Sequence, residues 1–158
     1  MSPAREVMTL RINGAERTVV ADPARPLLDA LRNQLGLTGT RYGCGANQCG
    51  ACNVMIDGQA VAACDTPLWA TAGKEIVTIE GLGTPERPHP LQRAVIAEQA
   101  SQCGYCLSGI LISAAALLKR TPNPSEAEVR SALDRNLCRC GAHNRIVRAV
   151  LRAAKEVT

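Results

Sequence analysis

Three closely spaced cysteines constrain this chain more than any other feature of its sequence. Cys44, Cys49 and Cys52 follow the spacing C-x4-C-x2-C, and a fourth cysteine, Cys64, stands further along. This spacing is typical of the plant-type ligand set of a [2Fe–2S] cluster. The loop also contains the glycines Gly43, Gly45 and Gly50. Glycines let the backbone turn sharply and bring its N–H groups close to sulfur, so we expect an electron-transfer site here.

Four more cysteines lie in the second half of the chain. Cys103 and Cys106 have the spacing C-x2-C, and Cys138 and Cys140 have the spacing C-x-C. Each pair is expected to join two helices, so two such hairpins packed side by side would bring four thiolates together. Spacing alone leaves zinc and iron–sulfur equally open, because both accept four cysteines.

A disulfide framework is the alternative interpretation of eight cysteines. The tight clusters suit metal ligation better than long-range disulfides. Residues 1–10 include Arg5 and Glu6 and do not resemble a signal peptide, which favours a cytoplasmic location, although export with a partner stays open. No run of about eighteen apolar residues predicts a membrane span.

The formal net charge of +4 does not indicate a nucleic-acid partner. Two oxidised [2Fe–2S] clusters with four thiolates each carry about −2 apiece and would offset that charge. Aromatic residues are only 2% of the chain, and no basic stripe is interleaved with them.

The first half of the chain reads as a small α+β unit whose sheet wraps one helix. Asn13-Gly14 and Asp57-Gly58 are strong hairpin signals. Pro26 opens a helix that Gly36 ends. The expected strands are 6–12, 16–20, 53–56, 59–63 and 75–80, with a short helical segment over 67–72.

Beyond a segment rich in glycine and proline, 81–90, every element reads as a helix. The expected helices are 91–100, 107–120, 125–135 and 144–155. Ser125 and Glu128 form a capping-box pattern at the start of the third. We therefore predict two domains, 1–82 and 83–158.

The chain resembles the small iron–sulfur subunits of molybdenum hydroxylases, the relatives of xanthine dehydrogenase and aldehyde oxidoreductase. The resemblance covers about residues 7–152, and all eight cysteines match in order and separation. It is carried by Gly43-Cys44-Gly45, Cys49-Gly50-Ala51-Cys52, Ile79-Glu80-Gly81-Leu82, His89-Pro90-Leu91-Gln92, Gln102-Cys103-Gly104-Tyr105-Cys106 and Asn136-Leu137-Cys138-Arg139-Cys140.

The resemblance implies a β-grasp, plant-type ferredoxin-like domain followed by a four-helix domain, each with one [2Fe–2S] cluster. The implied ligands of the outer cluster are Cys44, Cys49, Cys52 and Cys64, and those of the cluster nearer molybdenum are Cys103, Cys106, Cys138 and Cys140. Gln102 and Cys140 are implied to contact the molybdopterin, expected as its cytosine dinucleotide form, in a large partner subunit. Electrons would leave to a flavin subunit or a cytochrome.

The sequence departs from the family in two short segments that follow cysteines. Cys106-Leu107-Ser108-Gly109 replaces a common Cys-Thr-Pro-Gly, and Cys140-Gly141-Ala142-His143 replaces a common Cys-Thr-Gly-Tyr. The second variant is similar to subunits of nicotinate and isoquinoline oxidoreductases, so an N-heteroaromatic substrate is expected. The alternatives are the small subunit of an aldehyde oxidoreductase, a free-standing ferredoxin-like carrier and a zinc-stabilised interaction module.

Other residues receive plainer expectations. His89 is expected in the linker between the two domains, and His143 at the exposed start of a helix. Trp69, the sole tryptophan, is expected to pack in a core or between domains. Tyr42 and Tyr105 flank cysteines and are expected to shield them from water.

Overall fold

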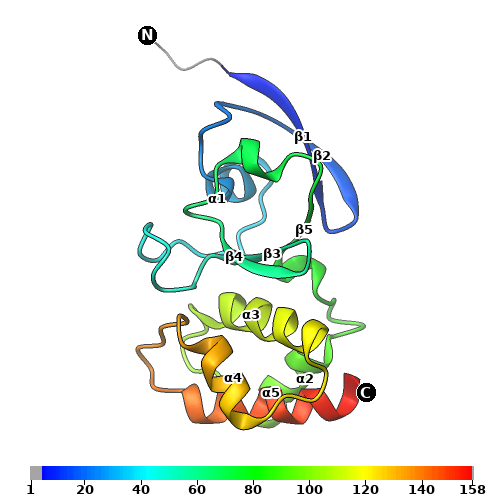
Figure 1. The fold of residues 1–158 in the computed structure, drawn as a ribbon, viewed down its shortest axis with the longest axis vertical. Helices are drawn as coiled ribbons and strands as arrows, with labels where there is room; N and C mark the ends of the chain where they lie inside the picture. Colours follow the sequence, from blue (N-terminus) through cyan, green and yellow to red (C-terminus); the bar gives the residue numbers. More distant parts are fainter. Residues whose placement is uncertain (1–4, 158) are drawn as a thin grey trace.

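The computed structural model describes residues 5–157 and divides into a sheet half and a helical half. The sheet half, residues 5–77, has five strands in the order β2-β1-β5-β3-β4 (Figure 1). The first two strands, β1 (Glu6–Ile12) and β2 (Ala15–Ala21), form an antiparallel hairpin. Its turn residues Asn13 and Gly14 have φ of 53° and 77°, the left-handed geometry of a type I′ turn, as predicted.

The helix of the sheet half is less regular than the sequence suggests. A short α1 (Leu27–Asp29) continues directly into a wider π-helical turn, η1 (Ala30–Gln34). Leu27, Leu28 and Leu31 are buried in the core of the sheet half. The chain leaves the wide turn at Gly36, which has φ of 67°, and runs into the first cysteine loop.

The second hairpin follows that loop. It consists of β3 (Asn53–Ile56) and β4 (Gln59–Ala62), and it turns at Asp57 and Gly58 with φ of 48° and 83°. A 3-10 turn, η2 (Leu68–Thr71), then leads to β5 (Glu75–Val77), which lies between β1 and β3.

The prediction that the last strand runs to residue 80 is wrong, because it ends at Val77. The side chain of Asn13 takes the place of a strand partner there. Its Oδ1 accepts from the Thr78 N–H at 2.9 Å, and its Nδ2 donates to Thr78 Oγ1 at 3.0 Å. The chain then turns through the 3-10 segment η3 (Ile79–Gly81).

Four helices make up the helical half, as predicted. They are α2 (Pro90–Ala97), α3 (Leu107–Arg120), α4 (Glu126–Leu133) and α5 (His143–Val157). His89 caps α2, because its Nδ1 accepts from the Leu91 N–H at 3.2 Å while Gln92 Oε1 accepts from the His89 N–H at 2.8 Å. His89 is therefore a helix cap rather than a simple linker residue.

The two halves pack closely along α3. Figure 1 shows α3 beneath β3 and β4, with the other three helices on its far side. All residues of α3 from Gly109 to Leu118 are buried, and Asn53 of β3 donates to Ser113 Oγ at 2.8 Å. Val77, Ile79 and Leu82 already pack against the helical core, while the predicted boundary after residue 82 stays a prediction.

The expectation for Trp69 is wrong. Trp69 is 62% exposed, and its N–H donates to the Pro23 carbonyl at 3.0 Å. Among the helices of residues 5–157, none is long and apolar enough to cross a membrane.

Candidate metal centres

The first site contains the sulfurs of Cys44, Cys49, Cys52 and Cys64. Cys44 and Cys49 lie on the loop between η1 and β3, Cys52 ends that loop, and Cys64 lies just beyond β4. Cys44 is exposed, whereas Cys52 and Cys64 are buried. The hairpin β3–β4 brings Cys64 to the loop, because Ala63 N–H bonds to the Cys52 carbonyl at 3.2 Å and the Cys64 N–H donates to Cys52 Sγ at 3.4 Å.

Backbone N–H groups surround the exposed sulfur of this site. Cys44 Sγ accepts from the N–H groups of Ala46, Gln48 and Cys49 at 3.3, 3.2 and 3.4 Å. The Cys44 N–H donates in turn to Cys49 Sγ at 3.3 Å. These donors lower the pKa of Cys44 to about 6, so the loop favours a thiolate at this position before any metal is bound.

The buried thiol of the first site has the opposite preference. Burial raises the pKa of Cys52 to about 12, and the neighbouring thiols of Cys64 and Cys49 add to the shift. A buried thiolate without a counter-charge is costly, so Cys52 needs a cation to ionise. An iron bound there would supply that charge and release the proton.

Glycine is required at two positions of the loop for reasons of space. A Cβ on Gly43 would lie 2.5 Å from Cys49 Sγ, and a Cβ on Gly50, which has φ of 69°, would lie 2.5 Å from Asn136 Nδ2. Four neighbouring thiols, backbone donors to sulfur and a loop that excludes larger side chains are what a bound iron–sulfur cluster needs. The first site fits the plant-type cluster that its spacing predicts.

The second site contains the sulfurs of Cys103, Cys106, Cys138 and Cys140. The first two lie between α2 and α3, and the last two lie between α4 and α5. Packing of α2 on α5 and of α3 on α4 brings the two segments together, as predicted. Sγ of Cys140 lies 3.4 Å from Sγ of Cys103, and the thiol of Cys106 lies beside that of Cys138.

The second site combines one exposed thiol, Cys103, with three half-buried ones. The Tyr105 N–H and the Cys140 thiol lower the pKa of Cys103, which is fully exposed. Burial and the adjacent Cys138 raise the pKa of Cys106 to about 12. Cys106 is also the N-cap residue of α3, so the positive end of a 14-residue helix faces this site.

In both sites the thiols come as two pairs. The pairs are Cys44 with Cys49, Cys52 with Cys64, Cys103 with Cys140, and Cys106 with Cys138. A [2Fe–2S] cluster takes two thiolates on each of its irons, so paired thiols match its needs. Within the described residues 5–157, no three or more His, Cys, Asp or Glu side chains are arranged to hold one metal ion.

A short segment before Cys138 joins the two sites. The Leu137 N–H donates to the Cys49 carbonyl at 3.0 Å, and Asn136 Nδ2 donates to the Gly50 carbonyl at 3.4 Å. Arg135 Nη2 donates to the Asn47 carbonyl at 2.5 Å. Each cysteine loop is therefore held against the other by hydrogen bonds.

Gln102 links the two segments of the second site. Its side chain is exposed, and its Nε2 donates to the Cys140 carbonyl at 3.0 Å. That bond leaves the amide oxygen of Gln102 without a hydrogen bond within residues 5–157, so it remains able to accept one from a partner molecule. Its assignment as a pterin contact stays a prediction.

The two tyrosines lie between the sites. Tyr105 Oη donates to the Tyr42 carbonyl at 2.5 Å, and the guanidinium of Arg41 lies 5.6 Å from the centre of the Tyr105 ring. Tyr42 and Tyr105 are 57% and 48% exposed, and their shielding of the neighbouring sulfurs stays a prediction.

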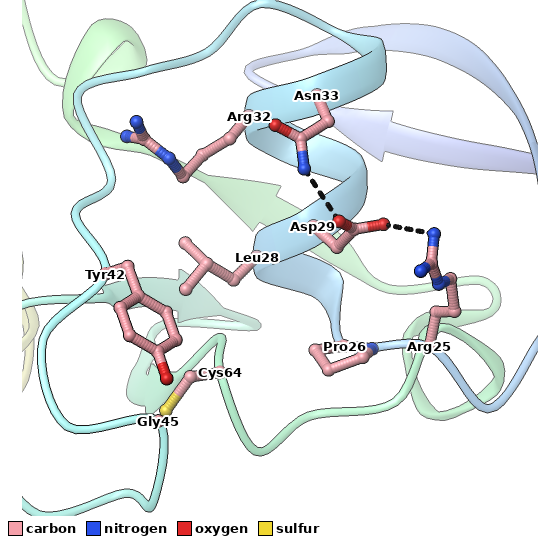
Figure 2. A pocket seen from close by; sticks show the side chains of 9 residues that line it. All are labelled: Arg25, Pro26, Leu28, Asp29, Arg32, Asn33, Tyr42, Gly45 and Cys64. Carbon is pink, nitrogen blue, oxygen red and sulfur yellow. Dashed lines mark hydrogen bonds and ion pairs between the residues drawn. The ribbon is translucent and has the colours of Figure 1, made fainter.

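A hollow of about 500 Å³ opens beside Cys64. Figure 2 shows the Tyr42 hydroxyl directed toward Gly45 and Cys64 at one end. At the other end Asp29 accepts from Arg25 at 3.0 Å and from Asn33 at 2.7 Å. The hollow gives access from solvent to the first site.

Sequence reasoning missed the residues that fasten one site to the other. Arg135 is exposed and was not singled out, and Asn136, which is 2% exposed, appeared only as the first residue of a motif, without a role of its own. The only available signal was their place directly before Leu137-Cys138. His143, expected at an exposed helix start, begins α5 but is half-buried, with Nε2 3.1 Å from the Asn136 carbonyl oxygen.

Comparisons with known proteins agree with this arrangement. A family model described as a 2Fe-2S iron-sulfur cluster binding domain matches residues 10–76, and one described as a [2Fe-2S] binding domain matches residues 78–151. A nicotinate dehydrogenase subunit of Pseudomonas putida is 53% identical over 148 residues, 94% of each chain. The alpha subunit of isoquinoline 1-oxidoreductase of Brevundimonas diminuta is 53% identical over 146 residues, 92% of this chain and 95% of that relative.

A solved structure supports the same grouping. The fold matches a chain in the crystal structure of quinoline 2-oxidoreductase from Pseudomonas putida with a TM-score of 0.92 and 36% identity. The match covers 98% of this chain and 96% of that one. The β-grasp sheet followed by four helices, predicted from the sequence, is confirmed.

Proposed function

This chain belongs to the small [2Fe–2S] subunits of the molybdenum hydroxylases, and we propose that its eight cysteines hold two clusters that form an electron relay. It is therefore the electron-transfer subunit of an oxidoreductase whose molybdenum centre lies in a large partner subunit. The first cluster belongs to Cys44, Cys49, Cys52 and Cys64, and the second to Cys103, Cys106, Cys138 and Cys140.

The observation that carries this proposal is the hydrogen bond between the two sites. The Leu137 N–H donates to the Cys49 carbonyl at 3.0 Å, and Leu137 precedes Cys138 directly. One hydrogen bond and a few covalent bonds therefore connect a ligand of the first cluster to a ligand of the second. The clusters supply one-electron steps, and the chain keeps them at a fixed separation.

The second cluster is the one that faces the molybdenum cofactor in this proposal. Gln102 is exposed, and its amide is held in place by the Cys140 carbonyl. An accepting amide oxygen beside Cys140 suits an N–H or O–H group at the edge of a pterin. We assign Gln102 and Cys140 as the residues that contact the molybdopterin, in its cytosine dinucleotide form.

The first cluster is the exit of the relay. Cys44 is exposed, and the hollow beside Cys64 opens to solvent. A flavin subunit or a cytochrome could approach this side without displacing the large subunit from the second site. The cytoplasmic location remains a prediction from the sequence.

An N-heteroaromatic compound is the proposed substrate of the complete enzyme. The relatives named for nicotinate and isoquinoline are 53% identical to this chain, and the matching structure is named for quinoline. The residues that bind the substrate belong to the large subunit, so this assignment rests on the sequence similarity between the small subunits.

Anaerobic reduction of the purified complex tests the proposed function. Nicotinate or isoquinoline, added without an external acceptor, is expected to reduce both clusters and to produce two [2Fe–2S] signals by EPR. If benzaldehyde reduced the clusters and neither heterocycle did, the substrate would instead be an aldehyde. Purification of a fully loaded chain with no large subunit bound would favour the free-standing carrier.

The role of Gln102 is tested in the same complex. Gln102→Ala is expected to keep both EPR signals but to slow their reduction by substrate about tenfold, as expected when a positioned hydrogen bond is lost. Gln59→Ala, an exposed change on β4, serves as the control and should leave the rate unchanged. Loss of the second cluster in Gln102→Ala would mean that the residue is structural.

A further inference from the structure

One peptide group of the first cysteine loop is hydrogen-bonded at both ends. The Gln48 N–H donates to Cys44 Sγ at 3.2 Å. The carbonyl oxygen of the same peptide, that of Asn47, accepts from Arg135 Nη2 at 2.5 Å. A guanidinium from the helical half is thus connected through a single peptide group to a sulfur of the sheet half.

Arg135 is fixed where this contact requires it. Its neighbour Asn136 is buried, with its N–H bonded to the Leu133 carbonyl at 2.9 Å, and Leu137 is bonded to Cys49. Within residues 5–157, no carboxylate lies within ion-pair distance of Arg135. Its positive charge is therefore directed to the loop rather than neutralised by an acidic side chain.

A charge in this position affects the cluster in two ways. Hydrogen bonds polarise one another along a chain, so a cation on the Asn47 oxygen makes the Gln48 N–H a stronger donor to sulfur. Reduction also adds one negative charge to the cluster, and a nearby guanidinium stabilises that charge. Hydrogen bonds to sulfur and net charge are both determinants of an iron–sulfur potential.

We propose that Arg135 is a positioning residue that raises the reduction potential of the first cluster through the Asn47–Gln48 peptide. This inference rests on the proposed function, since it requires a cluster on Cys44, Cys49, Cys52 and Cys64. A higher potential of the first cluster favours electron transfer from the second cluster to the first. Arg135, a residue of the helical half, would thus stabilise the reduced state of the cluster in the sheet half.

Redox titration of the complete complex, followed by EPR, tests this inference. Each signal is first assigned by the variant that removes it, Cys64→Ala or Cys138→Ala. Arg135→Met keeps a long side chain but removes the charge and the donors. At a fixed applied potential it is expected to lower the ratio of reduced to oxidised first cluster about threefold, equivalent to about 28 mV for one electron.

Two further variants separate charge from packing. Arg135→Lys keeps the charge and is expected to stay near the wild-type potential. Arg135→Gln keeps a neutral donor and is expected to fall between the wild type and Arg135→Met, so it carries the test if the Met variant loses its cluster. Arg120→Met removes an exposed arginine at the far end of α3, about 20 Å along the helix, and should change neither cluster.

The outcomes distinguish this inference from the proposed function. A wild-type protein without two [2Fe–2S] signals would contradict the function itself. Two loaded clusters whose potentials are unchanged in both Arg135→Met and Arg135→Gln would overturn only the role of Arg135. Equal shifts of both clusters would also overturn it, because they would indicate a general charge effect.

Discussion

The first site gathers three of its four cysteines from one loop, residues 44–52, whereas the second draws Cys103 and Cys140 together from 37 residues apart. In the first, the backbone of the loop itself supplies the donors around Cys44. In the second, the separation of the thiols is decided by how four helices pack. The first site therefore depends on local backbone geometry, and the second depends on the integrity of a core.

The contrast extends to how each site meets solvent. Cys44 on its exposed loop has a lowered pKa, while the pKa is raised for Cys52, which is buried, and for Cys106, which is half-buried. Each site thus contains at least one thiol that ionises readily and one that ionises only when a metal binds. Both sites therefore require a metal to ionise all of their thiols. Because one depends on a loop and the other on a helical core, different substitutions should disrupt them.

Gly43→Ala is the change expected to have the largest effect on the first site alone. The added Cβ would lie 2.5 Å from Cys49 Sγ, which the Cys44 N–H also holds. The ligand must move, so most of the EPR intensity of the first cluster and close to half of the bound iron should be lost. The second cluster should be retained.

The control for this variant is Gly73→Ala. Gly73 has φ of 69°, and a Cβ added to it would meet no atom within 4 Å, so the substitution adds backbone strain without a clash. It should keep both clusters. Loss of both clusters in Gly43→Ala would contradict the local character of the first site.

Ile146→Ala is expected to affect the second site. Ile146 of α5 is 2% exposed and belongs to the helical core beside Cys106 and Cys138. Truncation should lower the free energy of unfolding by about 3 kcal/mol, from lost burial and the cavity left behind. In a thermal scan followed by EPR, the second signal should disappear at a lower temperature than the first.

Leu27→Ala is the matched change in the sheet half, where Leu27 is fully buried. It should cost a similar free energy and reverse the order, with the first signal lost earlier. Loss of both signals together in both variants would show that the two halves unfold as one unit and that the two sites do not depend on separate parts of the fold.

The smallest expected effect concerns pH and the cap of α2. His89 accepts the Leu91 N–H through Nδ1, which requires a neutral ring, and burial with the nearby Arg93 lowers its pKa below 6.5. Its contribution is therefore complete above pH 6.5 and is lost as the pH falls through the folded pKa. The cost of losing a cap is about 1 kcal/mol.

His89→Asn provides the comparison, because asparagine caps helices without titrating in this range. Unfolding midpoints of the two proteins should be similar at pH 8 and should diverge at pH 5, with the wild type the less stable. A constant difference across that range would mean that the cap does not depend on protonation of His89.

Local signals accounted for much of the fold. Asn13-Gly14 and Asp57-Gly58 gave both hairpins, because type I′ turns need residues that tolerate positive φ. Ser125 and Glu128 marked the start of α4, and the cap is formed, with the Glu128 N–H donating to Ser125 Oγ at 3.3 Å. Such signals lie within a few residues of the structure they specify.

What the sequence did not reveal depends on distant partners. The early end of β5 follows from Asn13, which is 65 residues away from Thr78 in the chain. Arg135 and its contact at Asn47 are 88 residues apart. No local pattern contains either pair. The cysteine clusters were therefore visible in the sequence, while the contacts that join the two sites were not.

Analysis of iron and acid-labile sulfide together with EPR of the dithionite-reduced protein tests the central claim most directly. Two clusters predict about four irons and four sulfides per chain and two distinct [2Fe–2S] signals of equal intensity. One signal accompanied by one zinc per chain would contradict the claim, because it would assign the second site to a structural metal ion instead of a relay.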